Sequence, residues 1–122
     1  MNKELSILCI EDCESDFRLI ERELKRAGMI GTCRRVDDRA ALLAALAEVR
    51  WDVVLSDYSV PGIYFIETLG LFKRDWPDLP LILVSATIGE VKAAAMVQLG
   101  TRAFVSKENL EDLVPTIQRY LK

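Results

Sequence analysis

Residues 52–57 read DVVLSD, and residues 81–85 read LILVS. Both runs are short and apolar at their centres, as expected of strands in a parallel sheet that is covered on both faces. The first run ends on Asp57 and is followed by Val60-Pro61-Gly62, a turn signal. These two stretches favour an α/β fold with a buried sheet.

Away from these runs, short apolar stretches alternate with amphipathic ones. Further strands are expected at residues 5–10 (LSILCI), 30–36 and 102–105. Helices are expected at residues 15–27, 39–50, 63–74, 89–99 and 110–121. Strands that alternate with helices pair in parallel through right-handed crossovers. The sequence therefore predicts a doubly wound sheet of five parallel strands with helices on both faces.

Three helix ends carry specific expectations. Asp38 and Asn109 are of the residue types that cap helix N-termini, so we expect them to start the second and fifth helices. Pro115 lies inside the expected fifth helix. A proline there would remove a backbone hydrogen bond and bend the helix.

The composition indicates one globular domain that spans residues 1–122. Apolar residues make up 51% of the chain and charged residues 29%, which is typical of a folded protein. The net charge of −3 supplies no basic surface for nucleic acid. The longest apolar runs, such as residues 40–47, are too short to span a membrane.

The cysteines and the missing histidines narrow the chemistry. Cys9, Cys13 and Cys33 form no CxxC pair, and the chain has no histidine, so a zinc site would have almost no ligands. Free thiols favour a reducing, cytoplasmic location. Without histidine, the chain lacks both the commonest general base and a phosphohistidine. Its chemistry must use carboxylates, hydroxyls, lysine or a partner protein.

Polar side chains gather where the expected strands end. Glu11-Asp12 ends the first strand, Asp57 the third, Ser85-Ala86-Thr87 the fourth and Ser106-Lys107 the fifth. Ligands of such sheets bind at the carboxyl ends of the strands, where the strand order reverses. Crowded carboxylates repel one another, and a hard divalent cation such as Mg²⁺ would relieve the repulsion. With a lysine alongside, the site could offset the charge of a phosphoryl group and make Asp57 a candidate nucleophile.

The ordered set of Glu11-Asp12, Asp57 with Pro61-Gly62, Ser85-Ala86 and Lys107 closely resembles the receiver domain of two-component response regulators. The resemblance covers residues 5–121. It implies a flavodoxin-like (β/α)5 fold with strand order 2-1-3-4-5. It also implies a phosphoacceptor switch in a His-to-Asp phosphorelay. Such a protein is not an enzyme in the usual sense, although it catalyses its own phosphoryl uptake and loss.

The resemblance also implies a role for each acidic residue. Asp57 would accept the phosphoryl group from a phosphohistidine on a partner kinase or phosphotransfer protein. Asp12 and Asp57 would bind Mg²⁺ directly, together with the backbone carbonyl of Ser59. Glu11 would assist through a water molecule.

Three further residues would complete the implied site. Ser85 would donate a hydrogen bond to a phosphoryl oxygen. Lys107 would pair with the phosphoryl group, or with Asp57 when Asp57 is unmodified. Phe104 would occupy the aromatic switch position and rotate into space that Ser85 leaves. Ser59 and Thr87 occupy positions that tune the lifetime of the phosphoryl group in the family.

The sequence departs from the family pattern in places. Phe104 replaces the commoner tyrosine, so a switch would act by packing alone. Glu108 follows Lys107 where many relatives have a proline with a cis bond, and we expect a trans bond here. Residues 63–66 are apolar in succession, so at least one of them should be exposed.

The sequence allows two alternatives for the apolar face of the fourth helix. Val91, Ala94 and Ala95 either pack on the sheet or belong to an output surface formed by the fourth helix, fifth strand and fifth helix. A homodimer through that surface is one candidate assembly. The chain is expected to be either a standalone regulator or a piece of a larger protein.

The sequence argues against three other functions. A flavin or nucleotide binder would need a Gly/Ser/Thr-rich loop after the first strand, where this chain has Glu-Asp-Cys-Glu. A degenerate receiver that acts only as an interaction module would not need the complete acidic set and Lys107. An aspartate phosphatase would need a second acidic residue at position 59, which is Ser59.

Overall fold

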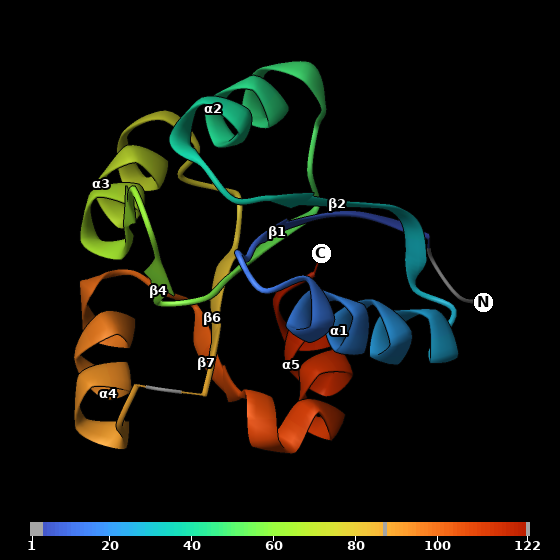
Figure 1. The fold of residues 1–122 in the computed structure, drawn as a ribbon. Helices are drawn as coiled ribbons and strands as arrows, with labels where there is room; N and C mark the ends of the chain where they lie inside the picture. The colour runs from blue at the N-terminus through green and yellow to red at the C-terminus, as the bar shows by residue number, and fades with distance from the viewer. Residues whose placement is uncertain (1–3, 87, 122) are drawn as a thin grey trace.

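The computed structural model describes residues 4–86 and 88–121. Five parallel strands form the central sheet in the order β2-β1-β3-β6-β7 (Figure 1). The strands are β1 (Leu5–Ile10), β2 (Ile30–Val36), β3 (Val53–Ser56), β6 (Leu81–Ser85) and β7 (Ala103–Ser106). Counted among these five, the order is 2-1-3-4-5, so the expected fold class and strand order are confirmed.

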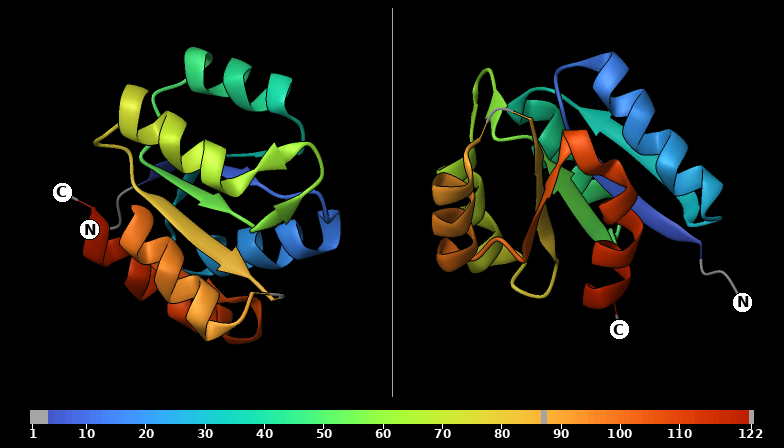
Figure 2. Two further views of the ribbon diagram at one scale, coloured as in Figure 1. Left: turned by 90° about the vertical axis from the view of Figure 1, so that its left-hand side faces the viewer. Right: turned by 90° about the horizontal axis from the view of Figure 1, so that it is seen from below.

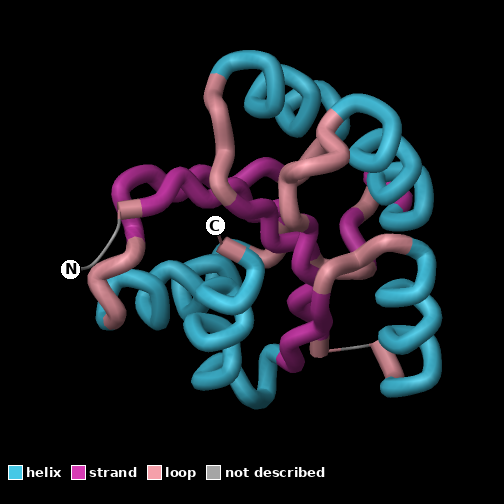
Figure 3. Tube along the Cα trace, turned by 180° about the vertical axis from the view of Figure 1, so that it is seen from behind, coloured by secondary structure: helices cyan, strands magenta, loops and turns pink. Residues whose placement is uncertain are grey.

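Helices cover both faces of the sheet, as the turned views show (Figure 2). From behind, the strands lie between the helices (Figure 3). The helices are α1 (Glu14–Arg26), α2 (Arg39–Glu48), α3 (Phe65–Asp75), α4 (Glu90–Leu99) and α5 (Leu113–Tyr120). One core cluster contains side chains of α1 and α5, and the other contains side chains of α2, α3 and α4.

The alternation of side chains along each strand explains the two cores. In β1, Ile7 and Cys9 face the α1–α5 side, whereas Leu8 and Ile10 face the α2–α3–α4 side. All five residues of β6 are buried, which agrees with its continuous apolar sequence. Because the sheet is buried on both faces, polar site residues of the strands can reach solvent only at the strand ends.

The segment after Asp57 differs from the expected loop and helix. Residues Ser59–Val60 (β4) and Ile63–Tyr64 (β5) pair as a short antiparallel hairpin, and α3 begins at Phe65 rather than at residue 63. The turn between them uses Gly62 at φ +81°, a left-handed conformation that glycine adopts without strain.

This hairpin and the start of α3 determine which side chains of the apolar run 63–66 are buried. Ile63 and Phe65 are buried, whereas Tyr64 is 69% exposed and Ile66 is 56% exposed. The expectation that at least one of these residues is exposed is confirmed.

The C-terminal segment also differs from the helix expected at residues 110–121. A 3-10 helix, η1 (Lys107–Asp112), precedes α5, and Asn109 has φ −130° and ψ 55° inside it. Asn109 is therefore not the N-cap of the last helix, and that expectation was wrong. Pro115 lies in the first turn of α5, where a backbone N–H has no partner within the helix. The expected loss of a hydrogen bond within α5 was wrong for this reason.

The exposed face of α4 shows whether Val91, Ala94 and Ala95 pack on the sheet. Ala93 and Met96 are its buried residues, while Val91 is 88% exposed and Ala94 and Ala95 are also exposed. Packing on the sheet therefore does not explain Val91, Ala94 and Ala95.

Within the described part of the chain, none of the helices is both long and apolar enough to cross a membrane.

Asp38 caps α2 as expected. Its Oδ1 accepts a hydrogen bond from the Ala41 backbone N at 2.7 Å. Asp38→Ala should lower the free energy of unfolding by about 1 kcal/mol, because the Ala41 N–H loses its acceptor. Urea denaturation measures the change. Asp78→Ala, on a turn outside the helices, is the control, and equal losses in both variants would contradict the capping role.

Candidate functional site

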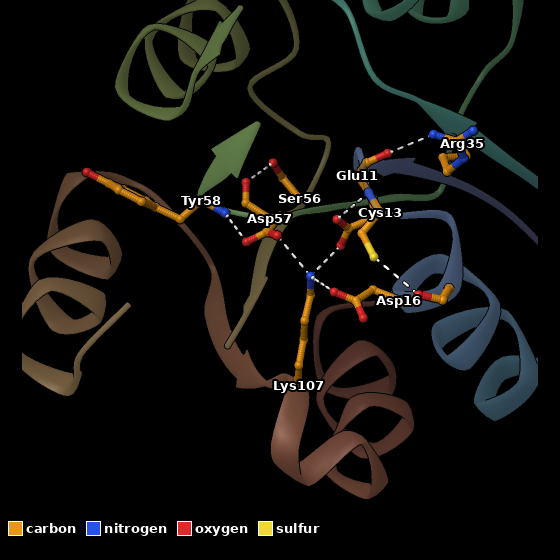
Figure 4. Close-up of polar contacts among 9 residues, drawn as sticks. Glu11, Cys13, Asp16, Arg35, Ser56, Asp57, Tyr58 and Lys107 are labelled. Atoms are coloured by element: carbon orange, nitrogen blue, oxygen red, sulfur yellow. Dashed lines mark hydrogen bonds and ion pairs between the residues drawn. The ribbon is translucent and has the colours of Figure 1, made fainter. Parts of the chain in front are cut away.

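The carboxyl ends of β1, β3 and β7 bring charged side chains to one edge of the sheet (Figure 4). The backbone N–H of Asp57 donates to the Ile10 carbonyl at 2.9 Å, and that of Glu11 donates to the Val36 carbonyl at 3.0 Å. These bonds continue the sheet's hydrogen bonding beyond the strands. They hold the backbone of both acidic residues against its neighbours.

Lys107 lies at the centre of the site. Its Nζ is 2.8 Å from Asp57 Oδ2, 2.8 Å from Asp16 Oδ2 and 2.6 Å from Glu11 Oε1. An ammonium has three N–H groups. Three carboxylates therefore surround one cation that is itself largely buried, with 11% of its side chain exposed.

Burial and charge act in opposite directions on Lys107. Burial lowers the pKa of its ammonium, but contacts with Asp16, Asp57 and Glu11 outweigh burial and raise that pKa above its ordinary value. Lys107 therefore stays charged over the physiological range. It supplies a permanent positive charge beside Asp57.

Glu11 is the most buried of the carboxylates. Burial raises the pKa of its carboxyl group, and the charge of Asp57 raises it further, while Lys107 and the Cys13 backbone N–H lower it. Its Oε1 is buried and forms an ion pair with Lys107 without hydrogen-bond geometry. Burial is thus the main cause of the raised pKa of Glu11, and repulsion from Asp57 is a smaller one.

The carboxylates of Glu11, Asp12 and Asp57, hereafter the acidic group, are close enough to share a cation. One oxygen of each lies within 4.8 Å of the others. Hard oxygen donors at this spacing are the ligands that Mg²⁺ prefers. The residues present thus fit the divalent cation that the sequence predicts.

The second oxygen of Asp57 is also engaged. Its Oδ1 accepts a hydrogen bond from the Tyr58 backbone N at 2.7 Å. The Tyr58 ring lies 5.6 Å from the Phe65 ring, and Lys92 Nζ of α4 lies 5.2 Å from the Tyr58 ring centroid. Both Asp57 oxygens are therefore held, which fixes the direction of its carboxylate.

The other described residues predicted for the site lie on β4, β6 and β7. Ser85 is 1% exposed at the end of β6, and its register partner in β7 is Ser106. Phe104 is half-buried in β7 and packs against the α2–α3–α4 core. Ser59 is exposed in β4. Thr87 lies outside the described residues.

Sequence reasoning missed Asp16. This residue lies in the first turn of α1 and bonds Lys107 across the site. The available signal was its position, since a residue early in the helix that follows Glu11-Asp12 starts near the same strand end.

Two other features of the sequence can be compared with the structure. Cys13 and Cys33 are half-buried and Cys9 is buried. The Lys107–Glu108 bond is trans, as expected.

The raised pKa of Glu11 predicts a pH dependence of stability. The folded chain keeps the Glu11 proton at pH values where the unfolded chain has released it. The contribution of Glu11 to the free energy of unfolding therefore falls as the pH rises from about 4.3 through its raised folded pKa. Relative to the wild type, Glu11→Gln should become steadily more stable across this window.

Urea denaturation in chelator-containing buffer at several pH values measures this trend. Glu14→Gln, on the exposed face of α1, is the matched control. A stability difference between Glu11→Gln and wild type that stays constant with pH would contradict the assignment.

Comparison with known proteins shows which family the chain resembles in sequence. The family model of the response regulator receiver domain matches residues 7–118. The DNA-binding transcriptional regulator NtrC of Escherichia coli K12 is 31% identical over 93% of this chain, but the chain spans only 24% of NtrC. Chemotaxis protein CheY-3 of Vibrio cholerae is 25% identical over 88% of this chain and 83% of CheY-3.

Solved structures agree with these sequence matches. The BeF3-activated receiver domain of NtrC has a TM-score of 0.73 at 28% identity, covering 98% of this chain and 95% of that one. A signal receiver domain from Bacteroides fragilis has a TM-score of 0.84 at 21% identity, covering 98% and 97%. Because the family model takes in nearly the whole chain, the chain belongs to the response regulator receiver domain family of two-component systems.

Proposed function

We propose that this chain is a phosphoacceptor signalling switch in which Asp57 takes a phosphoryl group from a phosphohistidine on a partner. One observation carries the proposal: Asp57 belongs to the acidic group and also lies 2.8 Å from the Lys107 ammonium. Carboxylates that can hold a divalent cation thus meet a fixed positive charge at the oxygen of a candidate nucleophile. Phosphoryl transfer depends chiefly on such positioning and charge stabilisation.

Mg²⁺ would be held by Asp12, Asp57 and the backbone carbonyl of Ser59, with Glu11 assisting. When bound, this ion offsets negative charge on the transferred phosphoryl group. Lys107 would supply a second positive charge, 2.8 Å from Asp57 Oδ2. Ser85, buried at the end of β6, donates a hydrogen bond to a phosphoryl oxygen.

In the transfer step, an Asp57 carboxylate oxygen attacks the phosphorus atom of the phosphohistidine. A new O–P bond forms as the P–N bond breaks, and the electron pair of that bond stays on the imidazole nitrogen of the donor. The donor is a histidine kinase or phosphotransfer protein, because this chain contains no histidine. Asp57 becomes an acyl phosphate, which the same site later hydrolyses.

The phosphoryl group changes a partner surface formed by α4, β7 and α5. Ser85 moves toward the phosphoryl oxygens, and Phe104 turns into the space that it leaves. Phosphorylation shifts the population only as far as it stabilises the active arrangement better than the resting one. The exposed Val91, Ala94 and Ala95 of α4 would belong to this surface, through which two copies could also pair.

The proposal also covers domain, location and partners. Residues 1–122 act as a single receiver domain in the cytoplasm, where thiols such as Cys13 stay reduced. The domain contacts proteins rather than nucleic acid or membrane. Its net charge of −3 agrees with this view.

Radiolabelled acetyl phosphate tests the function without a partner protein. The wild type should take up label in Mg²⁺ and lose uptake when the ion is chelated. Asp57→Asn should take up none. Asp52→Asn, at the opposite end of the same strand, is the matched control and should be labelled like the wild type.

Label retained by Asp57→Asn would overturn the phosphoacceptor assignment. Wild-type protein that takes up no label in saturating Mg²⁺ would instead favour an interaction module.

A further inference from the structure

We propose that Asp16 is a positioning residue that keeps Lys107 at the phosphoacceptor site when the acidic group binds its cation. The inference rests on the proposed function and deepens it. It assigns a role to a carboxylate outside the acidic group. Asp16 reaches the site from the first turn of α1, whereas Lys107 follows β7.

The contacts of Lys107 are the first step of the argument. Its ammonium touches three carboxylates, those of Glu11, Asp16 and Asp57, and the bonds to Asp16 and Asp57 are both 2.8 Å long. Figure 4 shows the Lys107 nitrogen between these side chains. Glu11 and Asp57 belong to the acidic group, and Asp16 does not.

Electrostatics makes this difference important. Glu11 and Asp57 are drawn toward a divalent cation in the acidic group, and Lys107 has the same sign of charge as that cation and is repelled by it. Of the three carboxylates that contact Lys107, only Asp16 lies outside the acidic group. Its charge is therefore available to Lys107 alone when the cation binds. Its carboxylate therefore holds the ammonium near Asp57 against the repulsion.

The burial of Asp16 fits a positioning role. Its side chain is 37% exposed, compared with 2% for Glu11 and 12% for Asp57. It lies at the rim of the site, so it can hold Lys107 without meeting the phosphoryl group. Asp16 acts through Lys107 and touches none of the reacting atoms.

Asp16→Ala should slow labelling by acetyl phosphate at saturating Mg²⁺ by about tenfold, because Lys107 is no longer held in place. Simple charge removal predicts the opposite, since a less acidic site repels an anionic phosphodonor less. Glu14→Ala is the matched control. It removes a carboxylate from the same helical turn, and Glu14 pairs with Arg18 rather than with Lys107.

A double-mutant cycle shows whether Asp16 acts through Lys107. In a Lys107→Met background, Asp16→Ala should cause no further slowing. Equal slowing in both backgrounds would overturn the proposal, as would an Asp16→Ala single variant that is labelled as fast as the wild type or faster.

A second readout needs no phosphorylation. Lysine ammonium protons are visible by ¹⁵N NMR when hydrogen bonds hold them and are lost when they exchange rapidly with water. The Lys107 signal should persist in wild-type protein with Mg²⁺ and disappear in Asp16→Ala with Mg²⁺. Persistence in Asp16→Ala would contradict the inference even if Asp57 proved not to be the phosphoacceptor. Failure of the proposed function would appear separately, as label in Asp57→Asn or none in the wild type.

Discussion

Lys107→Met is expected to slow phosphorylation by acetyl phosphate by about 100-fold to 1,000-fold at saturating Mg²⁺. Methionine has a similar length but carries no charge and no N–H donor. The variant therefore loses the cation that lies 2.8 Å from Asp57 Oδ2. A preorganised charge in a partly buried site contributes far more to the transition state than the same charge in water.

Saturating Mg²⁺ is essential to this measurement. Removing an ammonium from beside the acidic group should strengthen cation binding, which would hide part of the loss at low Mg²⁺. Lys25→Met is the matched control, since Lys25 is 64% exposed and its ion pair with Glu21 is 3.9 Å long. Equal rates for Lys107→Met and wild type would remove Lys107 from the transfer step.

Leu83→Ala should lower the free energy of unfolding by about 3 kcal/mol. Leu83 lies in the middle of β6, with neighbouring strands on both sides, and none of its surface is exposed. Truncation leaves a cavity against helices that pack on the α2–α3–α4 side of the sheet. The surrounding backbone is tied into two strand ladders and can close that cavity only in part.

Urea denaturation measures this loss. Leu99→Ala is the matched control, because Leu99 is 44% exposed at the end of α4 and should cost less than about 1 kcal/mol. Equal losses in the two variants would contradict the placement of Leu83 in a closed core.

Much of the fold could be predicted because burial and strand pattern coincide. The stretches at residues 5–10, 30–36 and 81–85 became strands with the expected bounds. Each is a short run rich in apolar or β-branched residues, and turn or cap residues flank it. The expected order of the five strands followed from resemblance to a family, since propensities along the chain do not specify which strands pair.

The errors lie where local turn chemistry outweighs periodicity. The hairpin around Pro61-Gly62 delays α3, because Ile63 and Tyr64 pair with β4 as a strand instead of starting the helix. At the C-terminus, η1 continues from Lys107 to Asp112 and leaves Asn109 without a capping role. In both places, a few residues of irregular backbone decide the boundary of the helix.

The site shows the same division. The acidic group and Lys107 could be predicted to meet because they follow parallel strands of one sheet, whose carboxyl ends lie at the same edge. For Asp16 the sequence signal was only its position early in the helix after Glu11-Asp12, because its contact with Lys107 depends on how α1 leaves β1 and on which way its first turn faces. The exposure of Val91 was also undecided, because an apolar residue of a helix fits a core and a partner surface equally well.

The most direct test of the phosphoacceptor claim is to locate the phosphoryl group in the wild-type chain. Borohydride reduces an aspartyl phosphate to homoserine, and tandem mass spectrometry then identifies the modified position. After treatment with acetyl phosphate and Mg²⁺, we predict modification at Asp57 and at no other carboxylate. Modification at Asp12 or Asp16 with Asp57 intact would contradict the account.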